Sequence, residues 1–285
     1  MMITAAARYA VIGNPVAHSR SPRIHALFAE ATEQRMTYER LPAPLAGFVQ
    51  TVREFRSAGG MGLSVTVPFK LECLAFAAAA TERAQAAGAA NTLAWRGDHW
   101  YADNTDGAGL ENDLARNLAF DVGGRDVLVL GAGGAARGIL APLLAGGPRR
   151  VVIANRTPEK ADHLATQFRE QLREPTRLFA SPLGALHDEP FSIVINATSA
   201  GLGADGADVP WWPPGIFARD ALAYDLMYAS TPTPFLRWAA GHGASRCADG
   251  LGMLVEQAAL QFQLWRGILP ATAPVLAQLR AELKS

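Results

Sequence analysis

Short apolar runs alternate with longer amphipathic stretches through the first hundred residues of the chain. This pattern predicts strands that end at Ile12, Pro42 and Val67, and helices at 22–31, 48–55 and from Phe69 onward. Ser21 stands directly before Pro22 and is expected to be the N-cap of the first helix. Two further runs, 90–95 and 99–102, flank a Gly-containing turn and indicate a hairpin. Strands that alternate with helices are typical of a largely parallel α/β sheet.

A second α/β pattern begins after Asp106. It predicts helices at 108–119, 158–172, 251–265 and 274–283, and strands at 126–130, 150–155, 191–196 and 221–225. The two closing helices are expected to return to the first domain. We therefore predict one domain formed by residues 1–107 and 246–285, and a second domain, residues 108–245, inserted into it.

Composition narrows the class of protein. Hydrophobic residues make up 49% of the chain and charged residues 18%, which is enough apolar material for a packed core. The 26 basic residues balance 26 acidic ones without a basic stripe, so no nucleic-acid partner is expected. The apolar stretch 127–147 contains Arg137 and several glycines, which favours a strand, turn and helix over a membrane span. The two cysteines lack metal-ligand spacing and suit a reducing cytoplasm.

A glycine-rich turn lies between the apolar strand 126–130 and the next predicted helix. Gly131, Gly133 and Gly134 would let backbone N–H groups approach a pyrophosphate at the helix N-terminus, although structural turns use glycine too. The following strand ends without a carboxylate, at Asn155 and Arg156. A carboxylate there would hold the ribose of NAD, whereas cations attract the 2′-phosphate of NADP. We therefore predict NADP(H) as the cofactor.

Polar side chains follow several strands of the first domain. Ser19 and Ser21 place two hydroxyls beside a helix start, where they suit a carboxylate or simply cap the helix. Thr66, Lys70, Asn91 and Asp106 stand at other strand ends; Asn91 and Asp106 are also common turn formers. In the run from 64 to 70, Val65 and Val67 are expected in the core and Thr66 toward a ligand. One amine, one acid and several hydrogen-bonding groups suit a small polyhydroxylated acid.

Nine ordered stretches resemble shikimate dehydrogenases. They are GNPVAHSRSPRIH, SVTVPFK, GAANT, NTDGAG, GAGGAAR, NRTPEK, NATSAG, YDLMY and DGLGMLVEQAA, and they cover nearly the full length. The resemblance implies NADPH-dependent, reversible reduction of 3-dehydroshikimate to shikimate in chorismate and aromatic amino-acid biosynthesis. It also implies an N-terminal, mostly parallel α/β substrate domain, an inserted Rossmann-type NADP-binding domain, and an active site in the cleft between them.

The same resemblance assigns roles to individual residues. Lys70 and Asp106 match the catalytic pair, with Lys70 as proton donor to the substrate oxygen. The implied substrate site consists of Ser19, Ser21, Thr66, Lys70, Asn91, Asp106, Tyr228 and Gln257. The implied cofactor site consists of Glu82, Gly131, Ala132, Gly133, Gly134, Ala135, Asn155, Arg156, Thr157, Lys160, Thr198, Leu226 and Gly250. Without the motif, Gln257 would be read as a surface glutamine and Tyr228 as a core aromatic.

One position departs from the family. Ser64 stands where the family has asparagine, so a hydrogen bond is expected to be lost or bridged by water. Ser21, where quinate-using relatives carry threonine, favours shikimate. Two alternatives stay open: a quinate/shikimate or aminoshikimate-type dehydrogenase, and a catalytically silent NADP-binding regulatory protein. A homodimer is expected, and the histidine spacing gives no reason to expect a metal.

Overall fold

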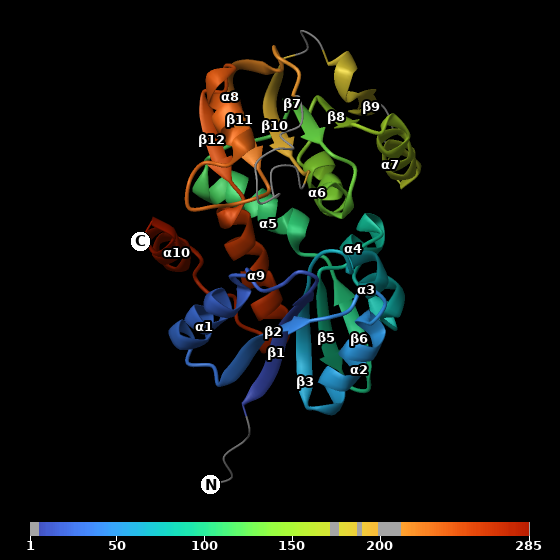
Figure 1. Ribbon diagram of the computed structural model, residues 1–285, viewed down its shortest axis with the longest axis vertical. Coiled ribbons are helices and arrows are strands. Elements are labelled where there is room, and N and C mark those ends of the chain that lie inside the picture. Colours follow the sequence, from blue (N-terminus) through green and yellow to red (C-terminus); the bar gives the residue numbers. More distant parts are fainter. Residues whose placement is uncertain (1–5, 172–176, 187–189, 199–211, 285) are drawn as a thin grey trace. The chain divides into compact units, whose positions relative to one another are not determined.

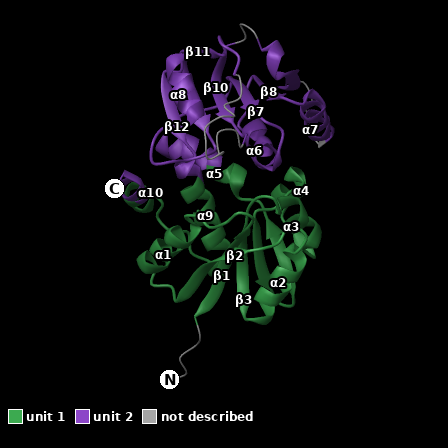
Figure 2. Cartoon of the chain, in the orientation of Figure 1, with its two compact units in different colours: residues 1–109, 254–278 green, residues 110–253, 279–285 purple. Residues whose placement is uncertain are grey.

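The computed structural model describes residues 6–171, 177–186, 190–198 and 212–284. The chain divides into two compact units (Figure 2). Unit 1 comprises residues 1–109 and 254–278, and unit 2 comprises residues 110–253 and 279–285. Within the described ranges, no helix is long and apolar enough to cross a membrane.

Unit 1 is built on a mixed sheet with the strand order β2-β1-β3-β5-β6-β4. Strand β1 pairs in parallel with β2 and β3, whereas β5 and β6 form the predicted antiparallel hairpin, which is confirmed. The strands are β1 (Ala7–Gly13), β2 (Met36–Pro42), β3 (Gly60–Val65), β4 (Ala79–Ala80), β5 (Thr92–Arg96) and β6 (His99–Asp103).

The helices of unit 1 follow the apolar pattern of the sequence. They are α1 (Ser21–Ala31), α2 (Phe48–Ser57), α3 (Lys70–Phe76) and α4 (Glu82–Ala87), with parts of α5 (Asp106–Asn112), α9 (Leu251–Arg266) and α10 (Ala273–Lys284). Helix α9 packs closely on the sheet: a Cβ at Gly62 would lie 2.4 Å from the indole nitrogen of Trp265. That nitrogen donates a hydrogen bond to the carbonyl of Leu93 at 3.0 Å.

Four local expectations are wrong. Arg20, not Ser21, is the N-cap of α1, and Ser21 is its first helical residue. Strand β3 ends at Val65, because the chain turns out of the sheet where the N–H of Phe69 donates to the carbonyl of Thr66 at 3.0 Å. Val67 therefore lies in a turn and is 58% exposed instead of buried. The expected helix 108–119 is α5 followed by a π-helical turn, Asp113–Asn117.

Unit 2 is a doubly wound sheet of parallel strands in the order β12-β11-β10-β7-β8-β9. The helices and strands of unit 2 are labelled in Figure 1. They are β7 (Asp126–Leu130), α6 (Gly134–Ala145), β8 (Arg150–Asn155), α7 (Pro158–Gln171), β9 (Leu178–Pro182), a short 3₁₀ turn (Leu183–Ala185), β10 (Phe191–Asn196), β11 (Phe217–Asp225), α8 (Pro234–Gly241) and β12 (Arg246–Asp249).

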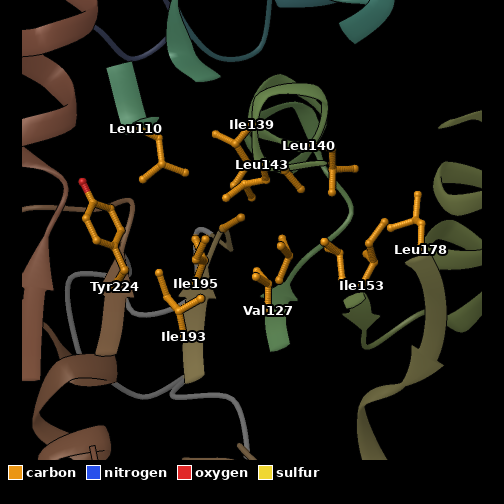
Figure 3. Close-up of a cluster of buried hydrophobic side chains, with 14 of the residues drawn as sticks. Leu110, Val127, Ile139, Leu140, Leu143, Ile153, Leu178, Ile193, Ile195 and Tyr224 are labelled. Carbon is orange, nitrogen blue, oxygen red and sulfur yellow. The ribbon is translucent and has the colours of Figure 1, made fainter. Parts of the chain in front are cut away.

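Both faces of this sheet are covered by helices. One face packs on α6 and α7, and its side chains form the cluster in Figure 3, where Val127, Ile153, Ile193 and Ile195 face Ile139, Leu140 and Leu143. The other face presents Leu128 and Leu130 to Phe235 and Leu236 of α8. Residues of β7 thus alternate between the two layers, as the period of a strand requires. The order of the strands reverses between β7 and β10, which is where ligands bind in such sheets.

Candidate functional site

Lys70 and Asp106 form an ion pair in unit 1. The Nζ atom of Lys70 lies 2.6 Å from Oδ2 of Asp106, and the two side chains are 16% and 9% exposed. Lys70 is held at the start of α3 by the turn that follows β3, and Asp106 begins α5. An amine and a carboxylate at this distance, with little water around them, can exchange a proton with a bound oxygen.

Asn91 fixes the carboxylate of this pair. It lies just before β5 and is only 3% exposed. Its Oδ1 accepts the backbone N–H of Thr105 at 2.9 Å, so its Nδ2 must face the other way, where it donates to Oδ1 of Asp106 at 2.8 Å. Asp106 therefore has one oxygen on Asn91 and the other on Lys70. The turn-former interpretation of Asn91 does not account for this contact.

Gln257 joins the same network from α9. It is 7% exposed, so it is not an ordinary surface glutamine. Its Oε1 accepts from Nδ2 of Asn91 at 3.2 Å, and its Nε2 donates to the carbonyl of Leu254 at 2.9 Å. Gln261, one helical turn later, donates through Nε2 to Oε1 of Gln257 at 2.9 Å. Sequence reasoning missed Gln261, although two glutamines four residues apart share one helix face.

Ser19 and Ser21 lie side by side at the start of α1. The Ser19 hydroxyl is 3.2 Å from that of Ser21 and accepts the backbone N–H of Ser21 at the same distance. Tyr38 of β2, which sequence reasoning also missed, lies near the Ser21 hydroxyl. Burial raises the pKa of Tyr38 above its usual value of 10.0, so the phenol keeps its proton.

Ser64 is hydrogen-bonded on both sides, and the loss of the family asparagine's hydrogen bond to substrate or to the loop stays a prediction. Its hydroxyl accepts from Tyr38 at 2.6 Å and donates to Oε1 of Gln261 at 2.5 Å. Both contacts are direct, so no bridging water is needed. Thr66, two residues later, is partly buried, and its methyl group fills the space where a Cβ of Gly13 would be.

The glycine-rich turn of unit 2 leaves room for a ligand. Gly131 has φ +110°, and a Cβ there would lie 3.0 Å from the methyl group of Thr198, so this position requires glycine. A Cβ at Gly133 or Gly134 would meet nothing within 4 Å. Ala132 completes the turn, which ends where α6 begins at Gly134, and Ala135 is the second residue of that helix. An anion can therefore reach the free N–H groups of the first turn of α6.

The end of β8 carries exposed cations. Arg156 and Lys160 are both exposed, and neither forms an ion pair within the described part of the chain. Asn155 donates from Nδ2 to the carbonyl of Thr157 at 2.9 Å, which shapes the turn that presents them. Free guanidinium and ammonium groups next to a dinucleotide turn fit a phosphate ester.

Three other residues of the implied cofactor site lie at strand ends of unit 2. Thr198 follows β10 and donates to Oδ1 of Asn196 at 2.7 Å. Leu226 directly follows β11, and Gly250 directly follows β12. A Cβ at Gly250 would lie 2.3 Å from the carbonyl oxygen of Leu226. This contact fixes Gly250 as glycine.

Two further residues, Tyr228 and Glu82, belong to the implied site. Tyr228 belongs to unit 2, whereas Gln257 belongs to unit 1. The contact of Tyr228 with substrate stays a prediction. Glu82 is an exposed residue at the start of α4, after the N-cap Thr81. Across the described residues, no three His, Cys, Asp or Glu side chains are grouped to hold a metal ion.

Comparison with known proteins identifies the family. Models described as the shikimate dehydrogenase substrate binding domain, shikimate / quinate 5-dehydrogenase and the shikimate 5′-dehydrogenase C-terminal domain match residues 11–93, 113–202 and 250–280. The shikimate dehydrogenase (NADP(+)) of Herminiimonas arsenicoxydans is 55% identical over 282 residues, which are 99% of this chain and 100% of that protein.

Solved structures agree with this match. An Ael1 enzyme from Pseudomonas putida is 46% identical with a TM-score of 0.85, covering 96% of this chain and 98% of that one. Shikimate 5-dehydrogenase from Thermus thermophilus, solved in complex with NADP(H) and shikimate, is 34% identical with a TM-score of 0.85, covering 97% and 100%. The resemblance inferred from the nine motifs is thereby confirmed. The chain belongs to the shikimate dehydrogenase family.

Proposed function

We propose that this protein catalyses the reversible, NADP-dependent interconversion of shikimate and 3-dehydroshikimate. The observation that carries the proposal is the Lys70–Asp106 pair, held by Asn91 and Gln257 in a chain whose relatives are named for this reaction. Unit 1 is the proposed substrate domain and unit 2 the proposed cofactor domain.

The residues of unit 2 support NADP(H) as the cofactor. When bound, NADPH would supply the hydride that reduces the ketone. The open space over Gly133 and Gly134 suits the pyrophosphate. Arg156 and Lys160 suit the 2′-phosphate, with Asn155 and Thr157 beside them. Thr198, Leu226 and Gly250 are proposed to line the nicotinamide side.

In unit 1, Lys70 is the proposed proton donor to the substrate oxygen in the direction of reduction. A lysine ammonium has three donors, and only one is used by Asp106, so the others are available to the substrate. Proton transfer must accompany hydride arrival, because a free alkoxide is costly away from water. Asp106 holds the Lys70 amine in place and accepts a hydrogen bond from a hydroxyl group of the substrate. In the reverse direction the same pair removes the proton.

The remaining polar groups of the network are proposed to bind the substrate. Ser19 and Ser21 would hold its carboxylate, because paired hydroxyls beside a helix start suit an anion. Thr66, Asn91 and Gln257 would contact its hydroxyl groups, and Tyr228 is proposed to complete the site. We predict a homodimer, and the molar mass measured by light scattering would test this.

A coupled absorbance assay tests the proposal. Purified protein is incubated with shikimate and NADP, and NADPH formation is followed at its absorbance maximum, with NAD in place of NADP and quinate in place of shikimate as controls. We expect turnover that requires shikimate and prefers NADP. Absence of shikimate-dependent NADPH formation would overturn the proposal and favour a silent NADP-binding protein. Faster turnover of quinate would favour the quinate/shikimate dehydrogenase alternative.

A further inference from the structure

A row of hydrogen-bonded side chains in unit 1 runs from Tyr38, which lies near Ser21 at the start of α1, to the Lys70–Asp106 pair. It is made of side chains from β2, β3, α9 and the segments around β5, and each neighbouring pair shares a hydrogen bond. In order, the row is Tyr38, Ser64, Gln261, Gln257, Asn91, Asp106 and Lys70.

Backbone groups at three places fix the direction of these hydrogen bonds. The Asn91 carbonyl accepts Nε2 of Gln261 at 3.3 Å, and a carbonyl can only accept. The Leu254 carbonyl accepts Nε2 of Gln257 and so fixes the orientation of that amide. The backbone N–H of Thr105 donates to Oδ1 of Asn91 and so fixes the orientation of the Asn91 amide. None of the three amides can therefore be reversed without losing a backbone partner.

Given this direction, Ser64 has one possible role. Because Nε2 of Gln261 faces Gln257, its Oε1 must face Ser64, so Ser64 has to donate. The hydroxyl of Ser64 has a single proton, which leaves Tyr38 as the donor in their shared bond. Ser64 is 6% exposed and Gln261 1%, so water cannot readily replace either contact.

We propose that Ser64 is a positioning residue that sets the affinity for shikimate by holding the Gln257 amide through Gln261 and by fixing the Tyr38 hydroxyl beside Ser21. This proposal rests on the proposed function, because it takes Gln257 and Ser21 as substrate contacts. Ser64 touches neither Lys70 nor Asp106, whose own contacts run through Asn91. Its influence therefore falls on substrate binding more than on the chemical step, and it does not extend to the cofactor.

Packing supports the role of Tyr38 in this row. The imidazole of His25, one turn after Ser21 on α1, stacks on the Tyr38 ring at 4.3 Å with an interplanar angle of 11°. Trp265, one turn after Gln261 on α9, contacts the same rings. The phenol can rotate little between these neighbours, so its hydroxyl stays in position to donate to Ser64.

Ser64→Ala tests the proposal, with Thr51→Ala as the matched control. Thr51 also loses one hydroxyl hydrogen bond in unit 1, to the Gly47 carbonyl at 2.8 Å, but it lies on α2 outside the row. For Ser64→Ala we expect the KM for shikimate to rise about tenfold, with kcat within about threefold and the KM for NADP within about twofold of wild type. Thr51→Ala should leave all three constants unchanged. Ser64→Thr, which keeps the hydroxyl, should recover most of the affinity.

A double-mutant cycle shows whether Ser64 acts through Gln261. We expect Gln261→Leu to raise the KM for shikimate, and Ser64→Ala to add little in the Gln261→Leu background. Thermal unfolding of each variant identifies any change that merely follows stability. The proposal is overturned if wild type is active but Ser64→Ala keeps its KM for shikimate, if the KM for NADP rises equally, or if the two changes add in full. An inactive wild type would instead overturn the proposed function.

Discussion

Lys70 and Asp106 each begin a helix, and their side chains meet with Nζ 2.6 Å from Oδ2. The partial positive charge at a helix start favours the carboxylate of Asp106 and disfavours the ammonium of Lys70. The carboxylate therefore supplies the countercharge that makes a lysine tolerable at the first turn of α3. Asn91 completes the arrangement by occupying the second oxygen of Asp106. A ligand oxygen that approaches this pair meets an amine already aimed by its partner.

Lys70→Ala removes the proposed proton donor and leaves unit 2 untouched. We expect kcat to fall by about 10² or more, whereas the Kd for NADP should stay within about twofold of wild type. Steady-state kinetics and a fluorescence titration with NADPH measure the two quantities. Lys284→Ala, at the end of α10, changes a lysine outside the proposed site and should have no effect. Wild-type turnover in Lys70→Ala would remove Lys70 from the mechanism.

Arg156→Ala combined with Lys160→Ala removes the exposed cations after β8. NADPH carries a 2′-phosphate and NADH does not, so the double variant should raise the KM for NADPH by at least about tenfold with little change for NADH. Initial rates with each coenzyme measure the ratio. Equal losses for both coenzymes would show that these cations do not select the phosphate.

Gly131→Ala and Gly133→Ala separate backbone strain from ligand binding. At Gly131 the positive φ and the nearby Thr198 methyl group should lower the free energy of unfolding by about 1–3 kcal/mol. At Gly133 the added methyl group meets no protein atom, so stability should be unchanged while NADP binding weakens. Urea unfolding and a binding titration of both variants test this contrast. A Gly133→Ala variant that binds NADP normally would argue against a pyrophosphate at the turn.

The imidazole of His25 should make stability depend on pH. His25 is fully buried, and this burial lowers its pKa from 6.5 to about 3. Between these values the unfolded chain binds a proton that the folded chain does not. The free energy of unfolding is therefore highest, as far as His25 is concerned, above pH 6.5. It decreases as the pH falls toward 3 and does not change further through His25 below that.

His25→Phe keeps a ring at this position and removes the titration. Urea unfolding of wild type and variant is compared at several pH values between 6 and 4. In this window wild type should lose about 1.4 kcal/mol per pH unit more than the variant. The carboxylates titrate in both proteins, so their effect on the free energy of unfolding cancels when the variant is subtracted from wild type. Parallel curves would mean that His25 is protonated in the folded state.

Much of the architecture could be predicted from local pattern. The strands of unit 2 are continuous apolar runs, as in a parallel sheet buried on both faces, and the hairpin around Gly97 has a turn residue with φ +60°. Short or exposed elements were missed, such as β12 (Arg246–Asp249) and β9, because four or five residues with mixed polarity carry no clear period.

The contact between Lys70 and Asp106 could be predicted only because the motifs resemble a family, since nothing local brings residue 70 to residue 106. The row through Ser64 lay beyond sequence reasoning for a similar reason. Ser64 and Gln261 are 197 residues apart, and their contact depends on how α9 packs on the sheet. The exposure of Val67 was missed because the alternation of a strand was extended past the turn that ends β3.

The packing of α9 also has a consequence for biosynthesis. Ser64 leaves the ribosome 197 residues before Gln261, an interval of roughly 10–40 s at about 5–20 residues per second. During that time the nascent first sheet lacks the helix whose side chains hydrogen-bond the Asn91 and Leu93 carbonyls and the Ser64 hydroxyl. Unit 1 is therefore begun first but cannot be finished until most of unit 2 has been made. The nascent chain is expected to depend on protection by chaperones in this interval, and its catalytic apparatus can be assembled only near the end of translation.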